Sequence, residues 1–147
     1  KTARSFGSSG LFGIELFCSV NGELFINEVA PRAHNSGHHT IEACATSQFE
    51  NQLRACLNLP LGDTTLRRKA LTMNLVGEPG FYGRPVVEGL EAFSRLPEAH
   101  IHFYGKAECR PGRKMGHVTL LASEYDELIA RANRVKSMLR IRGELKI

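Results

Sequence analysis

Two glutamates in this sequence have a spacing that suggests chemistry. Glu15 and Glu28 lie in apolar runs on either side of Asn21-Gly22, and Asn-Gly between two such runs is a strong signal for a hairpin with a two-residue turn. In that register Glu15 pairs directly with Glu28, with Cβ atoms about 4.5–5.5 Å apart. Because side chains of a strand alternate with period two, both carboxylates are expected on one face.

Two carboxylates held side by side repel each other, and a divalent cation relieves that repulsion. Mg²⁺ takes one or two protein carboxylates and fills its other positions with water and substrate phosphates. The same register sets Phe17 opposite Ile26, an apolar platform beside the metal. The alternative is a solvated strand face that carries both glutamates, and a β-bulge would break the register. The spacing alone does not decide between these two interpretations.

The loop PRAHNSGHH follows the return strand and brings a guanidinium, an imidazole and an amide within four residues. These belong to Arg32, His34 and Asn35, a combination that suits a small planar anion such as bicarbonate. A structural loop whose polar side chains cap backbone groups is an equal alternative. His38 and His39 are poor evidence for zinc, because adjacent histidines on a loop need further ligands.

A basic loop is expected at residues 106–116, between two predicted strands. Its cations are Lys106, Arg110, Arg113 and Lys114. Pro111-Gly112 predicts a tight turn that brings the arginines together, and clustered Arg and Lys on a rigid turn suit a phosphate group. Composition alone favours a solvated hairpin tip. A nucleic-acid surface is disfavoured because no aromatic residues are interleaved with the cations.

Hydrophobic periodicity predicts the elements that must position these groups. Strands are expected over residues 11–20, 23–29, 70–77, 100–105 and 117–123, with a loop over 78–85. Helices are expected after Ser47, over 87–96 and over 123–141. The first helix begins with a capping box of Ser47 and Glu50. Its apolar face is expected to consist of Phe49, Leu53, Cys56 and Leu57.

The composition is that of a globular protein, and its 147 residues suffice for one ordinary domain or two small ones. A polar, turn-rich segment near 60–68 predicts a boundary, with domains over 1–66 and 67–147. The net charge of +4 suits an anionic ligand. No run approaches the roughly 20 apolar residues of a membrane helix. The four cysteines form no Cys-x-x-Cys pair, which predicts reduced, buried thiols in a cytosolic protein.

Taken together, these segments resemble one family of enzymes. Residues 26–62, INEVAPRAHNSGHHTIEACATSQFENQLRACLNLPLG, resemble the C-terminal part of the ATP-grasp domain of N5-carboxyaminoimidazole ribonucleotide synthetases. Residues 107–121, AECRPGRKMGHVTLL, resemble the C-terminal domain of that family. The long NEVAPRAHNSGH run is specific, whereas formate-dependent glycinamide ribonucleotide transformylase and biotin carboxylase share only the Glu…Asn-Glu part and looser versions of the residues after it.

The resemblance implies an α+β fold. The expected architecture is the C-terminal lobe of an ATP-grasp domain with an antiparallel sheet, followed by a small β-rich C-terminal domain ending in a helix. The implied reaction is ATP-dependent carboxylation of 5-aminoimidazole ribonucleotide with bicarbonate, through carboxyphosphate, in de novo purine biosynthesis.

The resemblance also implies a role for each candidate residue. Glu15 and Glu28 would hold Mg²⁺ between the nucleotide phosphates, with Asn27 and Glu28 beside the ATP. Strict alternation puts Asn27 on the opposite face from Glu28, so either the strand is twisted there or Asn27 acts through its backbone. The loop residues would position bicarbonate: Arg32, His34 and Asn35. The basic loop would meet the substrate's carboxylate or ribose phosphate through Lys106, Arg110, Arg113 and Lys114.

Members of the family are much longer than this chain, and the ATP-grasp lysines that precede this part are absent here. We therefore expect a C-terminal fragment that is inactive alone. The intact enzyme is expected to be a cytoplasmic homodimer that binds small molecules, with no nucleic-acid or membrane partner. Two alternatives stay open: another ATP-grasp ligase, such as formate-dependent glycinamide ribonucleotide transformylase, and a non-catalytic module whose basic loop binds RNA or a partner.

Overall fold

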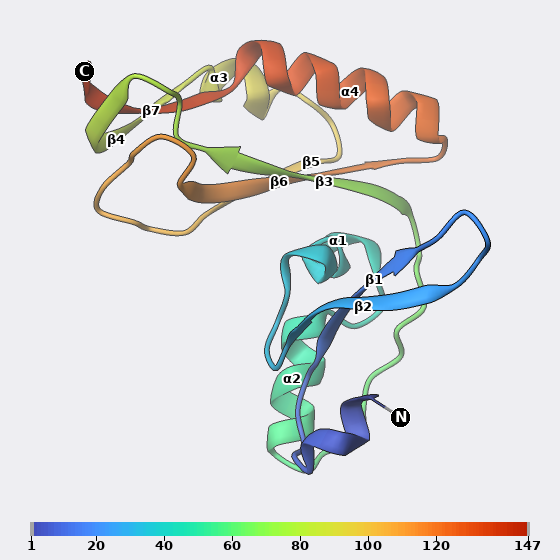
Figure 1. Ribbon diagram of the computed structural model, residues 1–147. Helices are drawn as coiled ribbons and strands as arrows, with labels where there is room; N and C mark the ends of the chain where they lie inside the picture. The colour runs from blue at the N-terminus through green and yellow to red at the C-terminus, as the bar shows by residue number, and fades with distance from the viewer. Residues whose placement is uncertain (1, 147) are drawn as a thin grey trace. The chain divides into compact units, whose positions relative to one another are not determined.

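The computed structural model describes residues 2–146, with side chains from Arg4 onward. The chain divides into two compact units, Lys1–Arg67 and Arg68–Ile147, which are called unit 1 and unit 2 below. Figure 1 shows their elements. In the described part of the chain, no helix is long and apolar enough to cross a membrane.

Unit 1 is built on a hairpin of two antiparallel strands, β1 (Gly13–Cys18) and β2 (Leu24–Ala30). A 3-10 turn, η1 (Thr2–Phe6), precedes the hairpin. The hairpin is followed by η2 (Asn35–Gly37), the short helix α1 (Thr40–Ala43) and helix α2 (Gln48–Cys56).

The turn of this hairpin is longer than the two residues that Asn-Gly predicts. The backbone N–H of Ser19 donates to the carbonyl of Glu23 at 2.9 Å, and Gly22 has a φ of +81°. As a result Phe17 pairs with Phe25. The predicted pairing of Phe17 with Ile26 is therefore wrong by one residue.

A β-bulge then restores the predicted register further along the hairpin. Leu16 pairs with Ile26, but Glu15 pairs with Glu28, so Asn27 is the extra residue on β2. A bulge inserts one residue into one strand and shifts everything beyond it by one position. The pairing of Glu15 with Glu28 is thus confirmed, although the sequence-based route to it contained two compensating errors.

Helix α2 begins where the sequence predicts, but its expected apolar face points outward. Ser47 Oγ accepts the N–H of Glu50 at 3.1 Å, whereas the Glu50 carboxylate bonds to Arg54, so only half of the capping box forms. The predicted core residues of this helix are exposed: Phe49, Leu53, Cys56 and Leu57. Gln48 and Asn51 are buried instead. These amides face inward because the loops beside them present backbone groups, and the Asn51 side chain accepts the N–H of Gly62 at 2.8 Å.

Unit 2 contains a three-stranded antiparallel sheet in the order β3-β6-β5. These strands span Lys69–Val76 (β3), Ala99–Phe103 (β5) and Lys114–Ala122 (β6). A second sheet pairs β4 (Phe81–Glu88) with β7 (Arg140–Lys146). The helices are α3 (Leu90–Ser94) and α4 (Tyr125–Met138), and α4 lies along one face of the three-stranded sheet (Figure 1).

The core of unit 2 forms between α4 and β6. Leu128 and Val135 of the helix are 1% exposed, and Val118 and Leu120 of the strand are fully buried in the same cluster. Burying one such side chain stabilises a fold by about 1.5–3 kcal/mol. The helix that hydrophobic periodicity predicts over 123–141 is therefore confirmed, with the shorter bounds Tyr125–Met138.

Two expectations for unit 2 are wrong. Residues 78–85 do not remain a loop, because β4 begins at Phe81, and the unit does not end in a helix, because β7 follows α4. The predicted helix over 87–96 shortens to Leu90–Ser94. Gly83, at a φ of +106°, and Pro85 hide β4 in the sequence, and both are accommodated where the register with β7 is irregular.

The cysteines are all free thiols, as expected, but their predicted burial is largely wrong. Cys109 is fully buried, Cys44 is half-buried, and Cys18 and Cys56 are exposed. Burial raises the pKa of the Cys109 thiol, because the charged thiolate is poorly solvated in the interior.

Candidate functional site

The first candidate site is the carboxylate cluster of unit 1, which consists of Glu15, Asn27, Glu28 and His34. The β-bulge places the Asn27 side chain beside Glu15, and its Nδ2 donates to Glu15 Oε2 at 3.1 Å. Asn27 therefore joins the cluster through its side chain, because strict alternation does not hold at a bulge. The glutamate side chains are 40% and 54% exposed, so both are accessible to a ligand.

His34 faces both carboxylates. Its Nε2 lies 3.7 Å from Glu15 Oε1 and 3.8 Å from Glu28 Oε1, while only 12% of its side chain is exposed. Its Nδ1 accepts the backbone N–H of Ser36 at 3.3 Å and lies 2.9 Å from Ser36 Oγ. A ring nitrogen that accepts a hydrogen bond carries no proton, so we assign the proton of the neutral ring to Nε2, on the side of the glutamates.

Gly13 allows His34 to approach the hairpin. A Cβ at this position would lie 2.5 Å from the Cβ of His34, which is closer than side-chain atoms pack. Gly13 and Ser36 belong to the site although the sequence patterns did not identify them. Nothing local in the sequence marks either residue, since their importance comes from the ring that packs on them.

The other two predicted bicarbonate ligands are engaged differently. Arg32 is exposed, and its Nη1 donates to the carbonyl of Ala33 at 2.9 Å. Asn35 begins η2, and its carbonyl accepts the N–H of His38 at 3.1 Å. The structure thus brings His34 to the carboxylates, whereas these contacts of Arg32 and Asn35 shape the loop itself.

The donor set of the carboxylate cluster fits Mg²⁺. Glu15 and Glu28 supply hard oxygen ligands from adjacent positions, and Asn27 supplies an amide. Among residues 4–146, no group of three or more His, Cys, Asp or Glu side chains could hold a metal by itself. A cation at Glu15 and Glu28 would therefore need further oxygen ligands, which is how Mg²⁺ binds between protein carboxylates and nucleotide phosphates.

The second candidate site is the basic loop of unit 2, which backbone hydrogen bonds hold in place. Cys109 and Gly83 exchange both of their backbone hydrogen bonds, at 3.0 and 2.7 Å. Gly77 donates to the carbonyl of Arg113 at 2.9 Å and accepts the N–H of Gly112 at 2.9 Å. A Cβ at Gly77 would collide with the carbonyl oxygen of Arg110. The loop is therefore a preformed structure and not a solvated tip.

The predicted loop over 106–116 is too long, because Lys114 is already the first residue of β6. The four predicted cations fall into two pairs. Lys106 donates to the carbonyl of Lys114 at 2.6 Å, and Arg113 donates to the carbonyl of Glu108 at 3.1 Å. Both of these side chains are half-buried. Arg110 and Lys114 are exposed, and in the described part of the chain neither has an acidic partner within 4.0 Å. The first pair shapes the loop, and the second pair is available to an anion.

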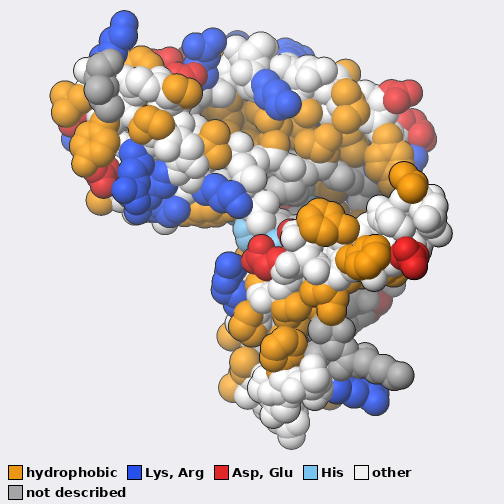
Figure 2. Space-filling view, in the orientation of Figure 1, with side chains coloured by type: hydrophobic (Ala, Val, Ile, Leu, Met, Phe, Trp, Pro, Cys, Tyr) orange, Lys and Arg blue, Asp and Glu red, His pale blue; other side chains and the backbone are white. Residues whose placement is uncertain are grey.

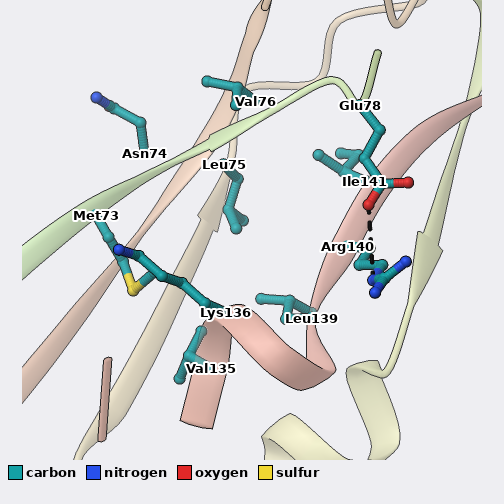
Figure 3. Close-up of a pocket in the computed structure, with 10 residues that line it drawn as sticks. All are labelled: Met73, Asn74, Leu75, Val76, Glu78, Val135, Lys136, Leu139, Arg140 and Ile141. Carbon is teal, nitrogen blue, oxygen red and sulfur yellow. Dashed lines mark ion pairs between the residues drawn. The ribbon is translucent and has the colours of Figure 1, made fainter. Parts of the chain in front are cut away.

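A cavity of about 360 Å³ in unit 2 is separate from all the predicted site residues. Its wall combines β3, the end of α4 and the start of β7, and Glu78 faces Arg140 across 3.6 Å at one side (Figure 3). The residues that line it are Met73, Asn74, Leu75, Val76, Glu78, Val135, Lys136, Leu139, Arg140 and Ile141. It contributes nothing to either candidate site.

Comparisons with known proteins identify both units. Residues 1–49 match the ATP-grasp domain, and residues 70–131 match the phosphoribosylaminoimidazole carboxylase C-terminal domain. The N5-carboxyaminoimidazole ribonucleotide synthase of Bacillus subtilis is 43% identical over 129 residues, which are 88% of this chain and 32% of that protein. The phosphoribosylaminoimidazole carboxylase of Schizosaccharomyces pombe is 44% identical over 132 residues, which are 84% of this chain and 23% of that protein.

Solved structures agree with this assignment. The N5-carboxyaminoimidazole ribonucleotide synthetase of Thermotoga maritima superimposes with a TM-score of 0.91 at 48% identity, over 97% of this chain and 40% of that one. The N5-carboxyaminoimidazole synthase of Aspergillus clavatus, in complex with ADP and 5-aminoimidazole ribonucleotide, gives 0.75 at 35% identity, over 87% of this chain and 34% of that one. The chain spans 23–32% of the length of these curated relatives. Its residues match part of an ATP-grasp domain, followed by the C-terminal domain of phosphoribosylaminoimidazole carboxylase, and over these two segments it is similar to the N5-carboxyaminoimidazole ribonucleotide synthetases.

Proposed function

We propose that the protein containing this chain carboxylates 5-aminoimidazole ribonucleotide with bicarbonate and ATP, giving N5-carboxyaminoimidazole ribonucleotide in de novo purine biosynthesis. The observation that carries the proposal is the carboxylate cluster, in which Glu15 and Glu28 are paired and both face His34. The similarity to a synthase that was solved with ADP and 5-aminoimidazole ribonucleotide supports the choice of substrate.

The proposed reaction has two stages. A bicarbonate oxygen attacks the γ-phosphorus of ATP, the bond to ADP breaks, and carboxyphosphate forms. Carboxyphosphate then loses phosphate to give CO₂, and the substrate amine adds to its carbon and loses a proton. The main task of a protein in phosphoryl transfer is to position the reactants and to offset developing negative charge.

In this proposal the carboxylate cluster holds the nucleotide. Glu15 and Glu28 would hold Mg²⁺, which would offset charge on the nucleotide phosphates, and Asn27 keeps the Glu15 carboxylate oriented by its 3.1 Å hydrogen bond. Bicarbonate is positioned by the loop that follows β2, through Arg32, His34 and Asn35. Support comes from His34, whose Nε2 lies 3.7 Å from the Glu15 carboxylate and 3.8 Å from the Glu28 carboxylate.

We propose that the basic loop binds the carboxylate or ribose phosphate of the substrate. Arg110 and Lys114 are suited to contact the anion because they are exposed and have no acidic partner among residues 4–146. Lys106 and Arg113 support the loop from within through their backbone hydrogen bonds.

The proposal also covers the domain organisation, the location and the oligomeric state of the protein. We infer that residues 1–66 form the C-terminal lobe of an ATP-grasp domain and residues 67–147 a small C-terminal domain, in a cytoplasmic protein that acts as a homodimer. The division of the chain at Arg67 supports the first inference. The homodimer is tested by the molar mass of the intact protein in solution.

The experiment that tests the function is ADP release by the intact protein, with each of its substrates omitted in turn. Release that requires 5-aminoimidazole ribonucleotide, bicarbonate and Mg²⁺ together is the expected result, and glycinamide ribonucleotide with formate should not replace the first two. Calorimetric titration with ADP, with and without Mg²⁺, then compares the wild type with a Glu15→Ala, Glu28→Ala double variant. Nucleotide binding that the double variant retains in full would overturn the metal assignment.

A further inference from the structure

The side chain of Gln48 makes three polar contacts with the loop after β2. Gln48 is the first residue of α2 and is only 9% exposed. Its Oε1 accepts the backbone N–H of His34 at 3.0 Å, and its Nε2 donates to the backbone carbonyl of His34 at 2.8 Å. The amide therefore holds both backbone groups of the residue whose ring faces the glutamates.

The third contact of this amide fixes a second ring. Nε2 of Gln48 lies 3.0 Å from Nδ1 of His38. An amide nitrogen has two hydrogens and can only donate, so Nδ1 of His38 is the acceptor and the neutral ring carries its proton on Nε2. One carboxamide thus makes three hydrogen bonds that no other common side chain of this size reproduces.

The backbone around Gln48 is adapted to this arrangement. The N–H of Gln48 donates to Thr40 Oγ1 at 2.8 Å, and the Thr40 hydroxyl donates to the carbonyl of Gly37 at 2.6 Å. A Cβ at Gly37 would collide with Oε1 of Gln48. The first residue of α2 is therefore bonded to the loop directly through its side chain, and through its main chain by way of Thr40 of α1.

We propose that Gln48 is a positioning residue of the carboxylate cluster, which aims Nε2 of His34 at Glu15 and Glu28 by fixing the backbone of His34. This inference rests on the proposed function, because it assigns Gln48 to the bicarbonate and metal side of that site. Gln48 contacts neither carboxylate and acts only through His34.

The test uses two matched substitutions on α2, Gln48→Glu and Gln52→Glu, in the intact protein. Among residues 4–146, the side chain of Gln52 makes one hydrogen bond, in which its Oε1 accepts the N–H of Ala33 at 3.3 Å, so a glutamate there keeps the contact. A glutamate at position 48 loses both donors and places a carboxylate against the carbonyl of His34. Each variant adds the same charge to the same helix, one turn apart, so a difference between them reports the lost donors.

Gln48→Glu should raise KM for bicarbonate or the Mg²⁺ requirement by about 10–100-fold, the range seen when an outer partner of a metal site is replaced. It should leave KM for 5-aminoimidazole ribonucleotide unchanged, and Gln52→Glu should leave all three unchanged. Bicarbonate and Mg²⁺ parameters equal to wild type in Gln48→Glu would overturn the proposal, as would equal losses in the two variants.

A spectroscopic measurement separates positioning from simple destabilisation. In ¹⁵N-histidine spectra of the wild type, the ring shifts should report His34 and His38 with protons on Nε2, and in Gln48→Glu the proton of His38 should move to Nδ1. A folded Gln48→Glu protein with unchanged ring shifts would contradict the inference. Gly37→Ala, which displaces the amide without changing it, should raise the same kinetic parameters if Gln48→Glu fails to fold. If the proposed function is wrong, the wild type will show no carboxylation, whereas the ring shifts will still test the contacts.

Discussion

The interiors of unit 1 and unit 2 are stabilised in different ways. Unit 2 buries large apolar side chains, such as Val118 and Leu120, between a sheet and a helix. The large apolar side chains of unit 1 are exposed on both strands of its hairpin, with Phe17 at 60% and Leu24 at 65%, and Figure 2 shows hydrophobic side chains across its surface.

The interior of unit 1 is small or polar instead. From Arg4 to Arg67, the buried residues are Ala30, Ala43, Thr46, Gln48 and Asn51. The difference teaches that hydrogen bonds, rather than apolar burial, fix the loops of unit 1. The geometry of unit 1 is therefore sensitive to the loss of single polar atoms, whereas the geometry of unit 2 depends on the volume of its buried apolar side chains.

The largest expected effect lies in the core of unit 2. Leu128→Ala should lower the free energy of unfolding of this unit by about 2–5 kcal/mol, because it removes a fully buried side chain and leaves a cavity. Leu24→Ala on the exposed hairpin should change the free energy of unfolding of unit 1 by less than about 0.5 kcal/mol. Urea unfolding followed by circular dichroism measures both, and equal losses would break the comparison between the two units.

A smaller effect is expected in the basic loop. Arg110→Ala should weaken binding of 5-aminoimidazole ribonucleotide by about 1.5–3 kcal/mol, which is typical of a lost hydrogen bond to a charged group. Arg84→Ala, an arginine on β4 outside the basic loop, is the control and should leave binding unchanged. KM of the intact protein reports the effect, and a loss that is equal for the two arginines would remove Arg110 from the site.

Two glycines sharpen the comparison, because an added Cβ meets backbone in one unit and a side chain in the other. Gly77→Ala should destabilise unit 2 by about 1–3 kcal/mol, since the carbonyl of Arg110 cannot move without the loop. Gly13→Ala should lower activity as well as stability, since the added Cβ meets the Cβ of His34 and the loop that carries this ring must shift away from the hairpin. Thermal unfolding and ADP release on both variants test this, and the opposite pattern would contradict it.

The smallest expected effects concern the thiols. Cys18 and Cys56 should react with a thiol reagent in the folded protein, because both are exposed. Cys109 should react only on unfolding, because it is buried and its raised pKa keeps it protonated at pH values where ordinary thiols begin to ionise. Mass spectrometry after brief labelling identifies the modified cysteines, and early labelling of Cys109 would show that the basic loop opens.

The hydrophobic periodicity of a segment predicts its buried face correctly where its apolar side packs against the rest of the unit. The spacing of Leu128, Ala132 and Val135 predicts the buried face of α4 because these residues repeat at the helical period. The same reasoning fails for α2, whose apolar stripe is exposed. Periodicity locates the face that differs from the others, but it does not say which face meets the rest of the unit.

The carboxylate cluster shows both outcomes in one hairpin. Glu15 and Glu28 are paired as their positions around Asn21-Gly22 predict, yet a longer turn and a bulge at Asn27 produce that pairing. A bulge leaves no mark in the alternation of side chains, so the sequence places Asn27 on the wrong face. The strand β4 was missed for a similar reason, since Gly83 and Pro85 are typical of loops when read without their partner strand.

The sequence by itself determined the family resemblance, the two charged clusters and most of the helices and strands, because these depend on residues close together along the chain. Only the tertiary structure decided how the clusters are built. His34 turns toward the glutamates because Ser36 holds its ring within the loop, while Gln48 and Gly13 fix it from separate segments. Such contacts depend on which backbone groups the fold brings within hydrogen-bonding distance, a property that no run of neighbouring residues contains.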